Sequence, residues 1–243
     1  MIAIILQARL DSSRLPGKAL LPLEGKPLLL RVMEALQYVS VPLRILACPK
    51  DAVDSFKPLA ESACFEIFAG SKEDVLGRFC SAIRHFALSG SRIIRATGDN
   101  PFVFCDAAEA ICREAEDVNA AYAGYAGLPY GAGVEAVSAD ALLRAEKEAV
   151  SPYHREHVCP YLYENGAVFP LHRPLAPLKW QSPSARLTVD TAADYERAKL
   201  LYAELSHGVQ AEIFAAKKER PDERFCGERI IEAYRRLFPD DAA

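Results

Sequence analysis

Short apolar runs alternate with helix-like segments through the first hundred residues, and this alternation restricts the fold more than any other feature. The strand-like runs are residues 2–8, 43–48, 65–68 and 91–96. Segments with the helical spacing of apolar residues lie between them, at 27–38, 51–63 and 73–88. Because strands that alternate with helices are joined by right-handed crossovers, the pattern predicts an α/β fold with three layers, α/β/α, and a mainly parallel mixed sheet.

The rest of the chain predicts further elements of both kinds. The expected helices are 106–117, 139–149, 153–164 with a kink at Pro160, 191–205, 208–218 and 224–237. The expected extended segments are 118–123, 134–137, 167–171 and 185–189, with a glycine-rich loop at 124–133. A chain of 243 residues suits one large domain, so we expect a single domain over 1–243.

Charge and cysteine content narrow the class of protein. The net charge is −4, so no overall positive field favours nucleic acid as a partner. The seven cysteines are scattered, odd in number and without a Cys-x-x-Cys pair, which is typical of reduced thiols in a cytoplasmic protein. The first apolar run is too short for a signal peptide, and no run approaches the roughly 20 apolar residues of a membrane span. We therefore expect no membrane association.

The loop after the first strand carries several cationic and hydroxyl side chains. Arg9, Arg14 and Lys18 supply positive charge, and Ser12 and Ser13 supply hydroxyl groups. Such a cluster can be a solvated loop, but here a buried strand precedes it and a Leu-Pro-Gly break turns the chain back. Arginine and lysine are the usual partners of phosphate groups, so the loop predicts a site for a nucleoside triphosphate. No Walker motif is present, which argues against a P-loop enzyme.

Two aspartates follow later strands and are candidate metal ligands. Asp99 lies in Thr-Gly-Asp-Asn-Pro after the strand 91–96, and Asp190 ends the segment 185–189. Magnesium prefers such hard oxygen ligands. The alternative for Asp99 is a turn or a helix cap, and the alternative for Asp190 is an N-cap of the helix that follows.

The opening motif resembles that of the sugar cytidylyltransferases. Gln-Ala-Arg-x-x-Ser-Ser-Arg-Leu-Pro-Gly-Lys, followed by Gly-Lys-Pro-Leu, is similar to the branch of spore coat polysaccharide biosynthesis protein F, which is related to the CMP-Kdo and CMP-sialate synthetases. The resemblance covers about residues 2–205. Relatives that use sugar 1-phosphates commonly have Gly-x-Gly-x-Arg at this turn, whereas this chain has residues 10–14 as Leu-Asp-Ser-Ser-Arg, which favours CTP.

The resemblance implies a fold, a reaction and an assembly. The fold is the Rossmann-like, GT-A-like fold of the nucleotide-diphospho-sugar transferases. The reaction is transfer of CMP from CTP to an acidic or deoxy sugar for glycan biosynthesis, with Mg²⁺ as cofactor and pyrophosphate as product. A homodimer is implied, with a dimerisation or sugar-binding insertion around 124–180 and C-terminal helices over 191–237.

The resemblance also assigns individual residues. Arg14, Lys18 and Asp99 are expected to be catalytic, and Asp99 and Asp190 are expected to bind the metal. The residues expected at the nucleotide are Gln7, Ala8, Arg9, Ser12, Ser13, Arg14, Lys18, Gly70, Ser71, Asp74, Arg78 and Thr97. The residues expected at the sugar are Asn100, Glu135, Arg155 and His157.

Several of these assignments have structural alternatives. The segment 70–78 resembles a family motif, but its Asp74 can simply cap a helix or form an i,i+4 pair with Arg78. Arg155 and His157 can lie in a subunit interface, and Glu135 can end a strand edge. Two other functions also remain open at this point: a nucleotidyltransferase that uses another triphosphate with a sugar 1-phosphate, and a nucleotide-binding homologue without catalysis.

Overall fold

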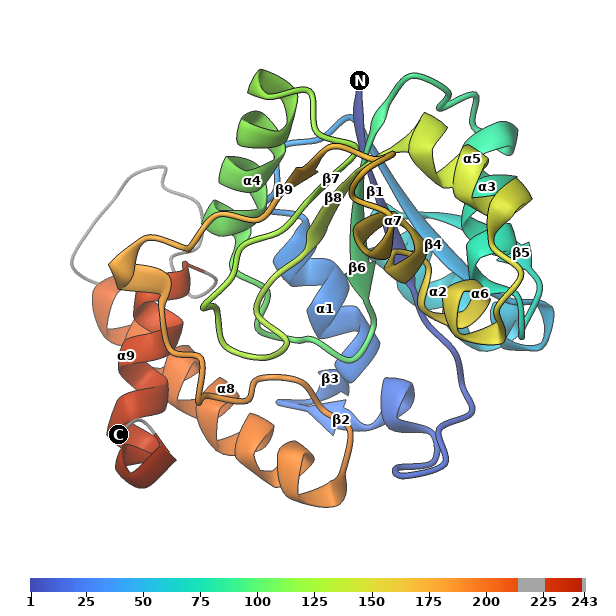
Figure 1. Cartoon of the computed structure of the whole chain (residues 1–243). Helices are drawn as coiled ribbons and strands as arrows, with labels where there is room; N and C mark the ends of the chain where they lie inside the picture. The colour runs from blue at the N-terminus through green and yellow to red at the C-terminus, as the bar shows by residue number, and fades with distance from the viewer. Residues whose placement is uncertain (214–225, 242–243) are drawn as a thin grey trace.

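A computed structural model describes residues 1–213 and 226–241 of the chain, and its centre is a twisted sheet (Figure 1). The sheet has seven strands in the order β5-β4-β1-β6-β8-β7-β9. The parallel half consists of β1 (Ile2–Gln7), β4 (Leu43–Pro49), β5 (Glu66–Gly70) and β6 (Arg92–Thr97). The other half consists of β7 (Tyr122–Ala123), β8 (Glu135–Ser138) and β9 (Leu171–His172), and β8 runs antiparallel to both β6 and β7. A small hairpin of β2 (Pro22–Leu23) and β3 (Lys26–Pro27) stands apart from the sheet.

Helices cover both faces of the sheet, so the three-layer α/β/α arrangement is confirmed. One face carries α1 (Leu28–Leu36), α2 (Val53–Ser62), α4 (Cys105–Asp117), α8 (Ala192–Ile213) and α9 (Gly227–Leu237). The other carries α3 (Val75–His85), α5 (Ala139–Glu148), α6 (Pro152–His157) and α7 (Pro160–Glu164). Figure 1 shows α4, α8 and α9 on one side of the strands and α3, α5 and α6 on the other. Short 3₁₀ turns are η1 (Lys18–Leu20), η2 (Lys50–Ala52), η3 (Leu178–Trp180) and η5 (Pro239–Asp241).

The first strand shows why the sequence adopts this arrangement. Ile4 and Leu6 pack into the core under α1 and α4, whereas Ala3 and Ile5 pack into the core under α3 and α5, and all four are fully buried. Successive side chains of a strand point to opposite faces, so a strand covered on both sides needs an uninterrupted apolar run. Each large aliphatic side chain buried in this way stabilises the fold by about 1.5–3 kcal/mol.

The predicted strand at 185–189 is wrong. This segment makes only an isolated bridge between Arg186 and Tyr130. Its backbone is instead held in two places: the Leu187 amide donates to the carbonyl of Tyr130 at 2.8 Å, and the Val189 amide donates to the carbonyl of Asp99 at 2.8 Å. The segment therefore crosses the carboxyl ends of the strands. Its apolar residues are buried there, although the segment does not form the regular hydrogen bonds of a strand in the sheet.

Other predicted segments differ in their extent. The helix expected at 153–164 is two short helices, because buried Val158 adopts φ +72°, a strained value for a β-branched residue, and Pro160 begins a new helix. The extended segments 118–123 and 167–171 are reduced to the two-residue strands β7 and β9. The helices expected at 191–205 and 208–218 are one continuous helix, α8, through Ile213; residues 214–218 and 224–225 of the predicted helices lie outside the described residues.

The topology gathers polar side chains at one edge of the sheet. The parallel strands β1, β4, β5 and β6 all end there, and the antiparallel strand β8 begins there, because Arg95 of β6 pairs with Glu135 of β8. Ligands of such sheets bind beyond the carboxyl ends of the strands. Among the helices in the described ranges, none is both long and apolar enough to span a membrane.

Candidate active site

A cavity of about 750 Å³ opens at this edge of the sheet. It is within the usual size range of small-molecule sites. The predicted site residues that line it are Gln7, Ala8, Arg9, Ser12, Ser13, Arg14, Lys18, Arg78, Thr97, Asp99, Asn100, Glu135, His157 and Asp190. Four predicted residues do not line it: Gly70, Ser71, Asp74 and Arg155. Segments that are more than a hundred residues apart in the sequence therefore meet in one cavity.

Lys18 joins the two predicted metal ligands. Its ammonium group donates to Asp99 Oδ2 at 2.9 Å, to Asp190 Oδ1 at 3.0 Å and to the carbonyl of Val189 at 2.9 Å. These three acceptors use all three of its N–H groups. Gly17, with φ +66°, makes the turn that places Lys18 at the start of η1. Because one nitrogen contacts both carboxylates, the two oxygens that it contacts lie at most about 6 Å apart.

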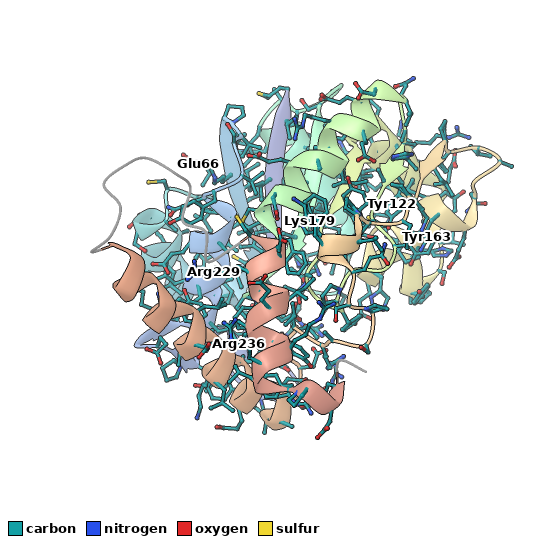
Figure 2. The ribbon with its side chains drawn as sticks, turned by 90° about the vertical axis from the view of Figure 1, so that its left-hand side faces the viewer. Glu66, Tyr122, Tyr163, Lys179, Arg229 and Arg236 are labelled. Carbon is teal, nitrogen blue, oxygen red and sulfur yellow. The ribbon has the colours of Figure 1, made fainter. Side chains whose placement is uncertain are left out.

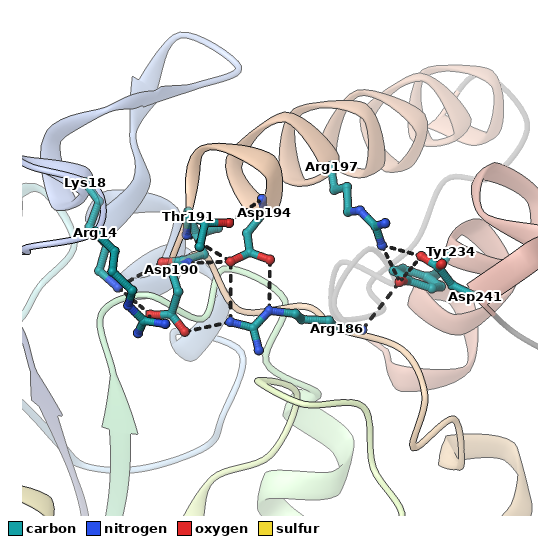
Figure 3. A network of polar contacts seen from close by, with 10 residues as sticks. Arg14, Lys18, Arg186, Asp190, Thr191, Asp194, Arg197, Tyr234 and Asp241 are labelled. Carbon is teal, nitrogen blue, oxygen red and sulfur yellow. Dashed lines mark hydrogen bonds and ion pairs between the residues drawn. The ribbon is translucent and has the colours of Figure 1, made fainter.

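Asp190 is surrounded by positive charge, as Figure 3 shows. Lys18 and Arg14 reach its Oδ1 at 3.0 and 3.1 Å, and Arg186 reaches its Oδ2 at 2.8 Å. Burial raises the pKa of Asp190, but the hydrogen bond from Lys18 and the charges of Lys18, Arg14 and Arg186 outweigh it and hold the pKa below the ordinary value. The carboxylate is therefore ionised at neutral pH.

The helix-capping alternative for Asp190 is wrong, because its neighbours cap α8. The Thr191 hydroxyl accepts from the amide of Asp194 at 3.2 Å, and the Asp194 carboxylate accepts from the amides of Thr191 and Asp190 at 2.9 and 3.0 Å. This reciprocal pair is a capping box. Asp194 also binds Arg186 at 2.8 Å, so the box orients the arginine that in turn holds Asp190. The sequence signal for this capping box is Thr-x-x-Asp at residues 191–194.

The two carboxylates are the type of oxygen ligand that holds a divalent ion such as Mg²⁺. Mg²⁺ is usually held by one or two carboxylates, with phosphate oxygens and water as its remaining ligands. Asp99 and Asp190 supply that number: the second oxygen of Asp99 accepts no hydrogen bond from any described residue, whereas Asp190 would exchange one of its cationic partners for the ion. Among the described residues, no three or more histidine, cysteine or acidic side chains are grouped so that they could hold a metal ion by themselves. This donor set suits an ion that shares its ligands with a phosphate.

The segment 70–78 has a different role from the one predicted for most of its residues. The Asp74 carboxylate caps α3 by accepting from the amide of Gly77 at 2.9 Å, so the capping alternative is confirmed. It also forms an ion pair with Arg155 rather than with Arg78, so the predicted i,i+4 pair is wrong. Arg155 donates a further bond to the carbonyl of Glu146 at 2.7 Å. Because its nitrogens tie α6 to α3 and α5, the sugar contact predicted for Arg155 has no support in this geometry.

The floor of the cavity contains an ion pair that the sequence reasoning missed. Arg95 pairs with Glu135, and their side chains are only 15% and 21% exposed. Glu135 also accepts from the hydroxyl of Tyr122 at 3.0 Å, and Arg95 donates to the side chain of Gln7 at 3.3 Å. A charged residue inside the apolar strand 92–97 was the available signal. Glu135 therefore lies at the cavity, but both of its oxygens are already engaged.

Aromatic rings form the wall on the side of α6 and α7. Tyr122 and Tyr163 have ring centroids 5.5 Å apart and lie side by side in Figure 2. Tyr153 packs against His157 at 4.8 Å, and the guanidinium of Arg173 lies 5.7 Å from the ring of Tyr163. All five side chains line the cavity. Aromatic faces and charged groups together suit a polyhydroxylated ligand that has both C–H faces and polar edges.

Comparison with known proteins identifies the family and the fold of the chain. Residues 3–226 match the family model described as cytidylyltransferase. The spore coat polysaccharide biosynthesis protein SpsF of Bacillus subtilis (strain 168) is 35% identical over 208 residues, which cover 83% of this chain and 86% of that protein.

Two solved structures share the fold. A cytidylyltransferase from Leptospira borgpetersenii superposes with a TM-score of 0.82 at 23% identity, covering 99% of this chain and 96% of that one. CMP:2-keto-3-deoxy-manno-octonic acid synthetase complexed with CTP gives a TM-score of 0.62 at 19% identity, covering 83% and 98%. The predicted family resemblance and the Rossmann-like nucleotidyltransferase fold are thus confirmed. This chain belongs to the cytidylyltransferase family.

Proposed function

We propose that this protein transfers CMP from CTP to the hydroxyl group of an acidic or deoxy sugar and releases pyrophosphate. The observation that carries the proposal is the Lys18 ammonium bound to Asp99 and Asp190 in a cavity that Arg9 and Arg14 also line. Cations and carboxylates in one recess fit a triphosphate that arrives with a divalent ion. The relative SpsF supports a role in polysaccharide biosynthesis by its name, and the related synthetase complexed with CTP supports the choice of nucleotide.

The reaction needs charge stabilisation more than covalent help from the protein. The sugar oxygen forms a bond to the α-phosphorus, the bond to the bridging oxygen breaks, and pyrophosphate leaves while the hydroxyl proton passes to solvent. Negative charge spreads over the phosphoryl oxygens in the transition state. Arg14, whose side chain is 63% exposed at the mouth of the cavity, and Lys18, which is 14% exposed inside it, supply fixed positive charge.

Asp99 and Asp190 are the residues that would hold Mg²⁺. When bound, the ion supplies Lewis-acid stabilisation of the phosphoryl oxygens. The hydrogen bond between the Val189 amide and the Asp99 carbonyl joins the two loops, so the spacing of the two carboxylates is fixed by the backbone as well as by Lys18. Arg186 and the capping box keep Asp190 ionised and oriented.

The acceptor fits the half of the cavity over β8 and α6. Glu135 and Arg95 form its floor, and Tyr153, His157 and Tyr163 form its wall. Asn100 also lines the cavity, although its side-chain amide donates to Thr97 at 2.8 Å. A homodimer formed through the segment 124–180 and a location in the cytoplasm stay predictions.

The direct test is pyrophosphate release with each of the four ribonucleoside triphosphates, Mg²⁺ and a panel of acidic and deoxy sugars. We expect turnover with CTP. Asp99→Asn should abolish the metal-dependent release while the far-ultraviolet circular dichroism spectrum and melting temperature stay close to those of the wild type. Turnover with another triphosphate and a sugar 1-phosphate would show that the protein transfers a different nucleotide and would contradict cytidylyl transfer. Full activity of Asp99→Asn would remove this residue from the site.

A further inference from the structure

The glycine-rich loop between β7 and β8 places an exposed tyrosine at the cavity. Tyr130 is 62% exposed and lines the cavity, so its ring contributes little to the hydrophobic core. Gly127 and Gly131, which precede and follow it, have φ values of +83° and +93°, a region that favours glycine. A Cβ at Gly131 would lie 2.6 Å from the amide nitrogen of Thr188. Glycine at this position therefore lets the loop approach the segment that ends at Asp190.

The backbone of Tyr130 is bound to that segment on both sides. Its amide donates to the carbonyl of Ala185 at 2.9 Å, and its carbonyl accepts from the amide of Leu187 at 2.8 Å. The residue between these two partners is Arg186, which forms the parallel bridge with Tyr130. The two hydrogen bonds therefore hold the tyrosine and the arginine in register.

The ring of Tyr130 covers one face of the Arg186 guanidinium. Arg186 Cζ lies 4.9 Å from the centroid of the ring, a distance at which a cation is attracted to an aromatic face. The nitrogens of the same guanidinium donate to Asp190 Oδ2 and to Asp194 Oδ1, both at 2.8 Å, as Figure 3 shows. Because a guanidinium is planar, contacts with its face and its edge together fix its position and its orientation.

Arg186 in turn fixes the orientation of Asp190. It takes Oδ2 of this carboxylate, whereas Oδ1 is the oxygen that Lys18 and Arg14 contact in the cavity. The Asp190 side chain is only 11% exposed, so water competes little for its contacts. Groups that orient the ligands of a metal ion contribute strongly to the affinity of metal sites. The ring of Tyr130 is therefore one contact removed from a proposed metal ligand.

We propose that Tyr130 is a positioning residue for the divalent ion: its ring holds Arg186, and Arg186 holds Asp190 in the orientation that accepts the ion. This inference rests on the proposed function, which assigns the ion to Asp190, but metal binding tests it without turnover. The role needs an aromatic face, so phenylalanine should serve as well as tyrosine. An aliphatic side chain would leave one face of the guanidinium to water, which screens its attraction to Asp190 and lets both side chains move.

The experiment measures the affinity of the protein for Mn²⁺ by electron paramagnetic resonance, with and without CMP. Mn²⁺ accepts the same carboxylate and phosphate oxygens as Mg²⁺. Tyr130→Leu should weaken Mn²⁺ binding about twofold to fivefold, the equivalent of an exposed cation–π contact, whereas Tyr130→Phe should bind Mn²⁺ as tightly as wild type. The matched control is Tyr153→Leu, which should keep the Mn²⁺ affinity of wild type. Tyr153 is also half-exposed and lines the same cavity, but it packs on His157.

A double-mutant cycle tests whether Tyr130 acts through Arg186. In a chain that already carries Arg186→Met, the further change Tyr130→Leu should not alter the Mn²⁺ affinity, because the ring no longer has a guanidinium to hold. If Tyr130→Leu weakens Mn²⁺ binding equally with and without Arg186, the tyrosine acts on the ion independently of the arginine, and the proposal is wrong.

Other outcomes would also overturn the role of Tyr130. If the residue only stabilises the loop, Tyr130→Leu lowers the melting temperature and keeps the Mn²⁺ affinity of wild type. An equal loss in Tyr130→Phe and Tyr130→Leu would assign the effect to the hydroxyl group instead of the ring. Tighter Mn²⁺ binding in Tyr130→Leu would show that Arg186 competes with the ion for Asp190. Absence of Mn²⁺ binding in wild type would overturn the metal assignment as well, whereas the other outcomes overturn this inference alone.

Discussion

Replacing Glu135 by glutamine tests the ion pair in the floor of the cavity. Glutamine keeps the shape of the side chain and an oxygen for the Tyr122 hydroxyl, but it removes the charge that faces Arg95. Removing one partner of a buried pair costs about 3–5 kcal/mol, since the other charge is left uncompensated. Two unit charges about 4 Å apart at an effective dielectric constant of about 20 give a similar value, about 4 kcal/mol. In a chain of this size, such a loss lowers the melting temperature by about 10 °C.

The assay is urea-induced unfolding followed by tryptophan fluorescence and circular dichroism, with pyrophosphate release measured in parallel. The double variant Arg95→Met with Glu135→Gln is the control, because it removes both charges and should recover at least half of the lost unfolding free energy. If Glu135→Gln unfolds at the same urea concentration as wild type but loses turnover, the argument from the buried ion pair is refuted. Glu135 would then act only as a contact to the sugar, the role first predicted for it.

Two further predictions concern thiols and acid stability. Burial raises the pKa of Cys48 to about 11 and the pKa values of Cys80 and Cys112 to about 12, whereas Cys64 is exposed. Iodoacetamide at pH 8 should therefore label Cys64 first and leave the buried thiols unlabelled until the chain unfolds. Mass spectrometry after timed labelling checks this order. Burial raises the pKa of Glu114, but hydrogen bonds from Tyr125 and His172 outweigh burial and lower this pKa overall. The ionised carboxylate therefore stabilises the fold at pH values above its pKa in the unfolded chain. This stabilisation disappears as the pH falls through the pKa in the folded protein. The difference in unfolding free energy between wild type and Glu114→Gln should therefore be larger at pH 7 than at about pH 3, and a constant difference would contradict this.

The parallel half of the sheet and the charged end of the site could be predicted from the sequence. The apolar runs around residues 4, 46 and 94 have the pattern of strands buried on both faces, and strands of this kind end at a common edge. Asp99 directly follows the end of one such strand, and Lys18 lies at the far end of the loop that follows another, so local pattern and topology together bring them to the same edge. The place of Asp190 beside them was predicted from its resemblance to a family motif. Strand topology does not explain it, because the strand expected before Asp190 does not form.

The floor and the aromatic wall could not be predicted in the same way. Arg95 meets Glu135 through the register of two antiparallel strands, and no periodicity within either strand specifies that register. Tyr153 and Tyr163 lie on two short helices whose separation depends on the strained backbone of Val158. Their positions follow from tertiary packing, which local propensity does not encode. The buried guanidinium of Arg78 likewise depends on the empty space beside Gly70.

The change of strand direction between β6 and β8 has a consequence for how such enzymes diversify. The residues proposed to bind the nucleotide come from β1, β5, β6 and the loops that follow them, together with the segment that ends at Asp190. The wall offered to the second substrate comes from the chain between β7 and β9. If the proposed function holds, exchange of that interval between homologues would change the acceptor sugar while the nucleotide-binding residues stay in place. The choice of acceptor could then evolve separately from the binding of the nucleotide.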